Sequence, residues 1–536
     1  MLSGDMGGYI MMRRMKNGVP ALLVLLMCMA ISVGTYAVYG QYNLDSDIAS
    51  EFVLAQLLNE EGRLMTDSWF YSTELRVVSP VPVYQLMLML CEDWHVARTA
   101  SIAVLLAGVA ASLVYMVRGM GASYTSALLC AAAVVLPITE YNSFTLVYGG
   151  FYTVCVMLTF VEIGLVLRMG KRKGLKRLLA PLLLALLGVY GGMGGVRMLM
   201  VCIAPLAAAC FVTFFIEVRT CEHIHDLFAL PSFPMLAGGV LLTAATLVGY
   251  KINTGVFAQM YDFAQYGETT VKPLTAEMFT DQIICLMSYF GYRNHELLLS
   301  LEGVVSVLAV ILPVAGAAAM ALMLQMKLDV RERLLAVFMP FALLLGMAIN
   351  VLTLTGDESS TLAYTVSYYM PAAILLVYAL FWVFDRFACR MKWVRVVPML
   401  AIVGVFLAGN MVYRDKEFKT YPTELEDIAW CLMDEWAYEG YATFWNANVL
   451  TEITGGEIEV FAVEEWKNGT INEWLQRKDH LDRRPEGTVF ALFRARDWKE
   501  GEPGFDSDRL VYASDEFYVV VYDSDEEFRQ AIGWAM

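Results

Sequence analysis

Long apolar runs alternate with short polar connections throughout residues 1–413. A helix needs about 20 residues to cross the hydrocarbon core of a bilayer, at a rise of about 1.5 Å per residue. In lipid, a helix is the only single segment that satisfies its own backbone hydrogen bonds. The pattern therefore predicts about eleven spans, at residues 19–41, 97–117, 122–138, 150–167, 178–190, 198–217, 234–250, 303–324, 334–355, 368–384 and 394–413.

The pattern changes after residue 413, where the apolar runs become shorter and alternate in the manner of strands. A helical pattern at 423–438 comes first, and turns are indicated by Gly455-Gly456 and by the Pro-Gly pair that ends at Gly504. The strand-like segments are 457–463, 488–493, 510–513 and 517–522. We therefore expect two domains, a transmembrane domain at 1–413 and a small α/β tail domain at 414–536.

The charges predict how the spans are oriented. Only 17% of the residues are charged. Much of the net charge of −16 lies in the tail domain, and such an acidic domain argues against nucleic acid as a partner. Arginine and lysine cluster in every second connection, as at 168–177 and 386–395, and such clusters face the cytoplasm. This places the N-terminus inside, and the tail domain outside together with the loops 42–96 and 251–302. The protein is expected in a bacterial plasma membrane.

Two stretches of loop 42–96 are predicted to lie on the outer surface of the membrane. The apolar run at 81–91 is too short to cross, and treating it as a span would put Lys171 and Lys173 outside. The second stretch begins after Asp47. Its apolar residues Ile48, Phe52, Ala55 and Leu58 are spaced to lie on one face of a helix, which could rest on the membrane surface.

Loop 42–96 also carries the candidate chemistry. Asp47 and Glu51 are four residues apart and share a helix face, and Glu74 and Arg76 follow. A carboxylate can take a proton from an acceptor hydroxyl, and an arginine can stabilise a phosphate as it leaves. Simpler interpretations stay open at this point. In these interpretations, Asp45 or Ser46 serves only to cap the following helix, and Glu51 is a solvated residue of the helix face or supports a neighbouring group. Glu74 and Arg76 would then form an ordinary ion pair on the surface.

The order of these features resembles that of a known family. A first span is followed by an outside loop that opens with an acidic residue, an aromatic-rich segment at 69–76, a Pro-containing surface helix and then His95-x-x-Arg98 before the next span. This order, which covers the first ~170 residues best, resembles the GT-C class of membrane glycosyltransferases. It is most similar to the protein mannosyltransferases and the lipid A aminoarabinose transferases.

The resemblance implies a polyprenyl-phosphate sugar donor used on the outer side of the membrane. By position it implies that Asp47 is the catalytic aspartate, and that Glu74 and Glu140 match two further acidic positions. The chain departs from the family in having Asp-Ser-Asp at 45–47 and Ser-Tyr-Tyr-Met-Pro at 367–371, where members often have Asp-Glu and Arg-Tyr.

Further candidates lie outside the first loop. Arg197, at the outer end of a span, binds a lipid phosphate or else extends to the membrane surface, because a charge within hydrocarbon is costly. In loop 251–302, Lys272 and Tyr261 suit phosphate contacts and sugar stacking, although such a loop also suits packing on lipid headgroups. The ten cysteines show no metal-binding spacing, so a metal site is left unknown and a divalent metal stays possible as a cofactor.

The sequence thus favours a glycosyltransferase of the inverting type that moves a sugar from a polyprenyl-phosphate donor to a glycan, lipid or protein of the cell envelope. Asp47 is the expected general base, and Glu74 and Glu140 are expected to orient the acceptor or to bind a metal if one is used. Arg76, Arg197 and Lys272 are the candidates for contact with the phosphate. Asp45, Glu51 and Tyr261 are further substrate-binding candidates. The alternatives are a transporter or flippase of lipid-linked glycans, and a non-catalytic membrane protein that binds the envelope.

Overall fold

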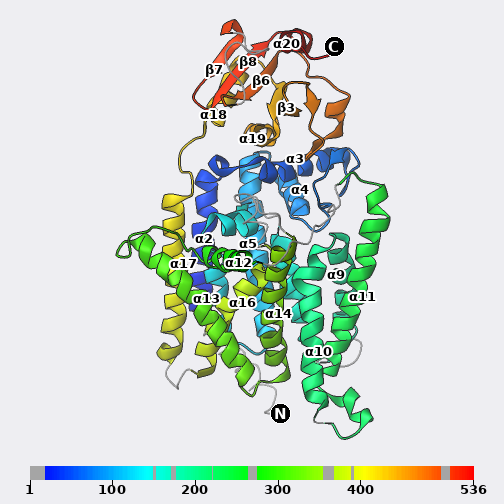
Figure 1. The fold of residues 1–536 in the computed structure, drawn as a ribbon, viewed down its shortest axis with the longest axis vertical. Coiled ribbons are helices and arrows are strands. Elements are labelled where there is room, and N and C mark those ends of the chain that lie inside the picture. Colours follow the sequence, from blue (N-terminus) through cyan, green and yellow to red (C-terminus); the bar gives the residue numbers. More distant parts are fainter. Residues whose placement is uncertain are drawn as a thin grey trace, which may run out of the picture.

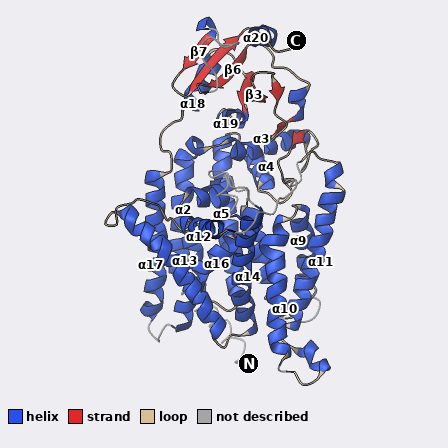
Figure 2. Cartoon of the chain, viewed as in Figure 1, coloured by secondary structure: helices blue, strands red, loops and turns tan. Residues whose placement is uncertain are grey.

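The computed structural model describes residues 18–148, 152–170, 177–219, 221–263, 275–353, 367–387, 392–496 and 507–535. The chain forms an elongated bundle of apolar helices with a tail domain of mixed helices and strands at one end (Figure 1). Figure 2 shows that the long strands all belong to the tail domain.

Eight helices of the described chain are long and apolar enough to cross a membrane. They are α2 (Val19–Tyr39), α5 (Trp94–Gly119), α10 (Ala204–Val218), α11 (Phe233–Gly255), α13 (Leu301–Gln325), α14 (Val330–Thr353), α16 (Met370–Phe387) and α17 (Lys392–Lys416). The other predicted spans are shorter apolar helices, α6 (Tyr124–Val134), α8 (Thr153–Val166) and α9 (Leu179–Met193). The predicted polytopic helical membrane fold is confirmed.

The connections gather at two ends of the bundle, as the charge pattern requires. Arg333 lies 3.9 Å from Glu217, and Arg386 lies 3.8 Å from Glu332, so three of the connections predicted to be cytoplasmic contact one another. At the other end, the Tyr190 hydroxyl donates to the carbonyl of Val77, which joins a span to loop 42–96.

The tail domain is built on a six-stranded sheet of order β4-β3-β2-β6-β8-β7. The central strands β3, β2 and β6 are parallel, and α19 supplies the crossover from β2 to β3. The strands and helices are β2 (Glu439–Thr443), β3 (Glu459–Glu465), β4 (Thr470–Ile471), β6 (Val489–Arg494), β7 (Leu510–Ala513), β8 (Phe517–Tyr522), α18 (Glu424–Asp434), α19 (Phe444–Ile453) and α20 (Asp525–Ile532). Each predicted strand is present, and β2 and α19 lie in a stretch that the pattern had left unassigned.

Loop 42–96 lies between the spans and the tail domain (Figure 1). Its helix α3 (Ser46–Glu61) packs against α19 of the tail domain and against α4 (Val81–Leu90) of its own loop. Strand β1 (Trp69–Phe70) pairs with β5 (Gln476–Arg477), which ties the loop to the tail domain a second time.

The expectation that α3 lies on the membrane surface is wrong. Its apolar residues Ile48 and Phe52 are 2% and 0% exposed, because protein rather than lipid covers them. The short helix α4 differs, since Met89 and Leu90 each keep 69% of their surface exposed. Only α4 therefore has the apolar exposure that contact with lipid requires.

Candidate active site beneath the tail domain

Asp45 begins the helix that carries the candidate aspartate. Its side chain accepts a hydrogen bond from the backbone N–H of Ile48 at 2.8 Å, so it is the N-cap of α3. Burial raises the pKa of Asp45 to about 7, and the nearby charges of Asp47 and Glu140 raise it further. Asp47 itself lies half-buried in the first turn of α3, where the helix dipole favours a negative charge.

Glu51, one turn further along α3, faces Arg76. Its Oε1 lies 3.5 Å from Arg76 Nε, and the Glu51 side chain is only 1% exposed, so the interpretation of a solvated residue is wrong. Burial raises the pKa of Glu51 to about 8, although the charges of Arg76 and Arg98 oppose this rise. Burial therefore favours the protonated form of Glu51, which adds no negative charge beside Arg76.

Arg197 binds the other carboxylate of the loop. Its Nη2 lies 2.7 Å from Glu74 Oε1, and its Nη1 donates to the hydroxyl of Ser367 at 2.6 Å. The guanidinium carbon lies 4.3 Å from the centre of the Tyr152 ring and 4.6 Å from the centre of the Tyr368 ring. The side chain is thus held inside the protein, and the interpretation in which it extends to the membrane surface is wrong.

These carboxylates and guanidiniums form one group. Asp47 lies close enough to Glu51 and Arg76 to shift the pKa of each, and Glu74 acts on the same two residues. We call Asp47, Glu51, Glu74, Arg76 and Arg197 the loop network. Such a network supplies both a carboxylate base and cationic groups for a phosphate.

Glu140 lies beside the loop network, on the side of Asp45. It begins α7 (Glu140–Asn142), and its backbone N–H donates to Glu417 at 3.0 Å. Arg293 pairs with the same Glu417 at 2.7 Å. Burial and the charge of Glu417 raise the pKa of Glu140.

The two candidates of loop 251–302 are placed differently. Tyr261 packs against the rings of Tyr71 and Phe257, with centroids 6.2 and 5.7 Å apart, in an aromatic cluster beneath the tail domain. Lys272 lies outside the described residues.

The sequence analysis missed several contributors to this site. Ser367 and Tyr368 were noted only as a departure from the family pattern, yet both contact Arg197. Nothing in the sequence marked Tyr152. Among the described residues, no group of three or more His, Cys, Asp or Glu side chains could hold a metal ion, so the described part of the site does not fit one.

Comparison with known proteins identifies the fold. No protein-family model matches the sequence, and no curated protein matches it either. The structure is similar to ArnT from Cupriavidus metallidurans bound to undecaprenyl phosphate, with a TM-score of 0.54 at 12% identity over 94% of this chain and 97% of that one. For ArnT in the apo state the TM-score is 0.53 at 13% identity, over 97% and 98%.

A weaker similarity exists to the oligosaccharyltransferase of Archaeoglobus fulgidus in its apo form, with a TM-score of 0.48 at 12% identity over 83% of this chain. This chain spans only 64% of the length of that enzyme. The similarity to ArnT extends over nearly the full length of both chains. The chain therefore has the fold of the aminoarabinose transferase ArnT, a membrane glycosyltransferase of the GT-C class.

Proposed function

We propose that this protein is a glycosyltransferase that moves a sugar from a polyprenyl-phosphate donor to a hydroxyl of a cell-envelope acceptor. The observation that carries the proposal is the loop network, in which Arg76 and Arg197 converge with an aspartate on one site beneath the tail domain. The similarity of fold to ArnT, crystallised with undecaprenyl phosphate, supports the same donor class.

In the proposed reaction Asp47 takes the proton of the acceptor hydroxyl. The oxygen attacks the anomeric carbon, the bond from that carbon to the phosphate oxygen breaks, and polyprenyl phosphate leaves. In-line attack of this kind inverts the anomeric centre.

The charge balance of the loop network suits the leaving group. Glu74 forms an ion pair with Arg197, whereas burial raises the pKa of Glu51 to about 8 and so favours its protonated form. With Glu51 protonated, one carboxylate fewer opposes Arg76 and Arg197, the groups that we assign to the phosphate. Asp45 lies near enough to Asp47 and Glu140 for their charges to raise its pKa, and we assign Asp45 and Glu140 to the acceptor. Lys272 and Tyr261 stay candidates for donor contacts.

We further propose that the N-terminus is cytoplasmic and that the tail domain and the active site are extracytoplasmic in a bacterial plasma membrane. The support is the clustering of basic residues in every second connection, two of which place Arg333 and Arg386 at the end of the bundle opposite the tail domain.

The role of Asp47 is tested by transfer in proteoliposomes that contain polyprenyl-phosphate-linked sugars and an extract of envelope glycolipids. We expect Asp47→Asn to lower the release of polyprenyl phosphate by about 10²–10⁴-fold, because the acceptor loses its base. Asp67→Asn is the matched control, since Asp67 is an exposed aspartate of the same loop. Undiminished release by Asp47→Asn would show that another group is the base.

A further inference from the structure

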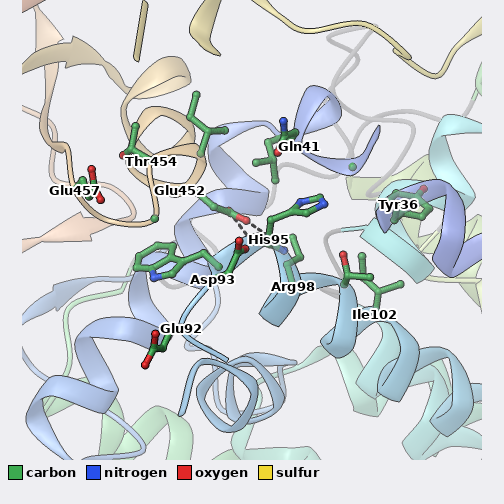
Figure 3. Close-up of a pocket in the computed structure, with 16 residues that line it drawn as sticks. Tyr36, Gln41, Glu92, Asp93, His95, Arg98, Ile102, Glu452, Thr454 and Glu457 are labelled. Carbon is green, nitrogen blue, oxygen red and sulfur yellow. Dashed lines mark hydrogen bonds and ion pairs between the residues drawn. The ribbon is translucent and has the colours of Figure 1, made fainter. Parts of the chain in front are cut away.

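A buried ion pair joins the tail domain to the membrane domain. Arg98, in the first turns of α5, donates through Nη2 to Glu452 Oε2 at 2.7 Å and through Nε to the other oxygen of that carboxylate. The two side chains are 6% and 4% exposed. Figure 3 shows them meeting across the domain boundary. A two-point contact of this kind fixes both the distance and the orientation of its partners.

The same guanidinium also contacts α3. Nη2 of Arg98 donates to the backbone carbonyl of Ile48 at 3.2 Å, and Ile48 directly follows Asp47. The guanidinium carbon lies 4.4 Å from the centre of the Phe52 ring, one turn further along α3. One side chain of α5 thus binds both α3 and α19, which are far apart in sequence.

The ion pair also forms part of the wall of a cavity of about 370 Å³ between the two domains. Gln41 and His95 line it from the membrane domain, and Thr454 and Glu457 from the tail domain (Figure 3). Packing is therefore incomplete beside the ion pair. The start of α3 is held to the tail domain by specific bonds as well as by apolar packing, since the Ser46 hydroxyl also donates to the carbonyl of Phe444 in the tail domain.

We propose that Arg98 is a positioning residue, which holds the first turn of α3, and with it Asp47, in the reactive position when Glu452 of the tail domain is docked. The tail domain would then be a required part of the active site. This inference rests on the proposed function for its effect on catalysis, but not for its effect on α3.

The test must separate positioning from folding. Removing one partner leaves an uncompensated buried charge, so a single substitution to an apolar residue would damage the fold for that reason alone. The double variant Arg98→Met with Glu452→Met removes both charges. Arg98→Lys is the conservative variant, since a lysine can pair with Glu452 but lacks the rigid fork that reaches Ile48 as well. Arg63→Met is the control, because Arg63 forms an exposed ion pair just after α3.

For both variants we expect kcat for transfer to fall by about 10- to 100-fold, because a small misplacement of a catalytic group is costly, with little change in the KM for the donor. Amide hydrogen exchange should quicken by at least about tenfold at residues 48–52, while β6 of the tail domain stays protected. Arg63→Met should change neither measurement.

Two results would overturn the inference. One is wild-type exchange at residues 48–52 in both variants, and the other is a wild-type kcat in both variants despite faster exchange. If the wild-type protein transfers no sugar at all, the proposed function fails, whereas faster exchange in the variants would still support the coupling of α3 to the tail domain.

Discussion

Two networks of carboxylates and cations in this protein have opposite effects on the pKa of the glutamate at their centre. In the loop network, burial raises the pKa of Glu51 to about 8, although Arg76 lies 3.5 Å away. In the tail domain, Glu459 of β3 accepts a hydrogen bond from His480 at 3.0 Å and is also bound by Arg483. Burial opposes ionisation there too, yet His480 and Arg483 hold the pKa of Glu459 at about 2.

The pKa values differ because the negative charge of each carboxylate is balanced to a different extent by nearby donors and cations. Glu459 is partly exposed and has several donors, so ionisation stabilises the fold. Glu51 is fully buried and competes with Asp47 and Glu74 for the same cations. A buried carboxylate whose pKa its surroundings raise towards neutral pH is typical of a functional site.

The strongest test of this contrast removes a cation from the loop network. Arg197→Met should lower transfer by about 10²-fold, because a group that stabilises the phosphate is lost. Binding of undecaprenyl phosphate, followed by native mass spectrometry in detergent, should weaken as well. Arg333→Met is the control, since it breaks an Arg–Glu pair at the opposite end of the bundle. Unchanged binding and turnover in Arg197→Met would assign the phosphate to other groups.

A smaller effect is expected when the tail network is broken. Glu459→Gln should destabilise the full chain by about 2 kcal/mol at pH 7, since each pKa unit corresponds to about 1.4 kcal/mol and partial exposure weakens the pair. The pKa of Glu459 is lowered, so its contribution is complete above the ordinary value of 4.5 and is lost as pH falls towards 2. Unfolding in detergent, followed by tryptophan fluorescence, measures this. A change in the transfer rate per folded molecule would show that the tail network is more than structural.

The smallest effect on transfer at pH 7 is expected for Glu51→Gln, because glutamine resembles the protonated carboxyl. The pKa of Glu51 is raised, so the stability it provides is complete below the ordinary value of 4.5 and is lost as pH rises through about 8. Transfer by the wild-type protein should also fall above about pH 8, when ionised Glu51 cancels Arg76. The variant should lack both changes. If the variant and the wild type showed the same dependence of stability and of transfer on pH, this assignment would be contradicted.

The sequence predicted the parts of the fold that depend on local pattern. Each predicted span is matched by an apolar helix, and the strands β3, β6, β7 and β8 lie where alternating residues indicated them. It did not predict the short strand β2 or the exact helix α19, because five residues give too weak a period to distinguish a strand. The burial of α3 was also missed, since an apolar helix face looks the same whether lipid or protein covers it.

What the sequence determined by itself is that the chain crosses a membrane many times and that its first loop is rich in carboxylates, because hydrophobic length and residue type are local properties. Only the tertiary structure decided which charges meet. Arg197 binds Glu74 from 123 residues away, and Glu452 reaches Arg98 from 354 residues away. The protonation of Glu51 also depends on tertiary structure, because desolvation comes from segments that fold over α3, and no pattern along the chain records which segments those are.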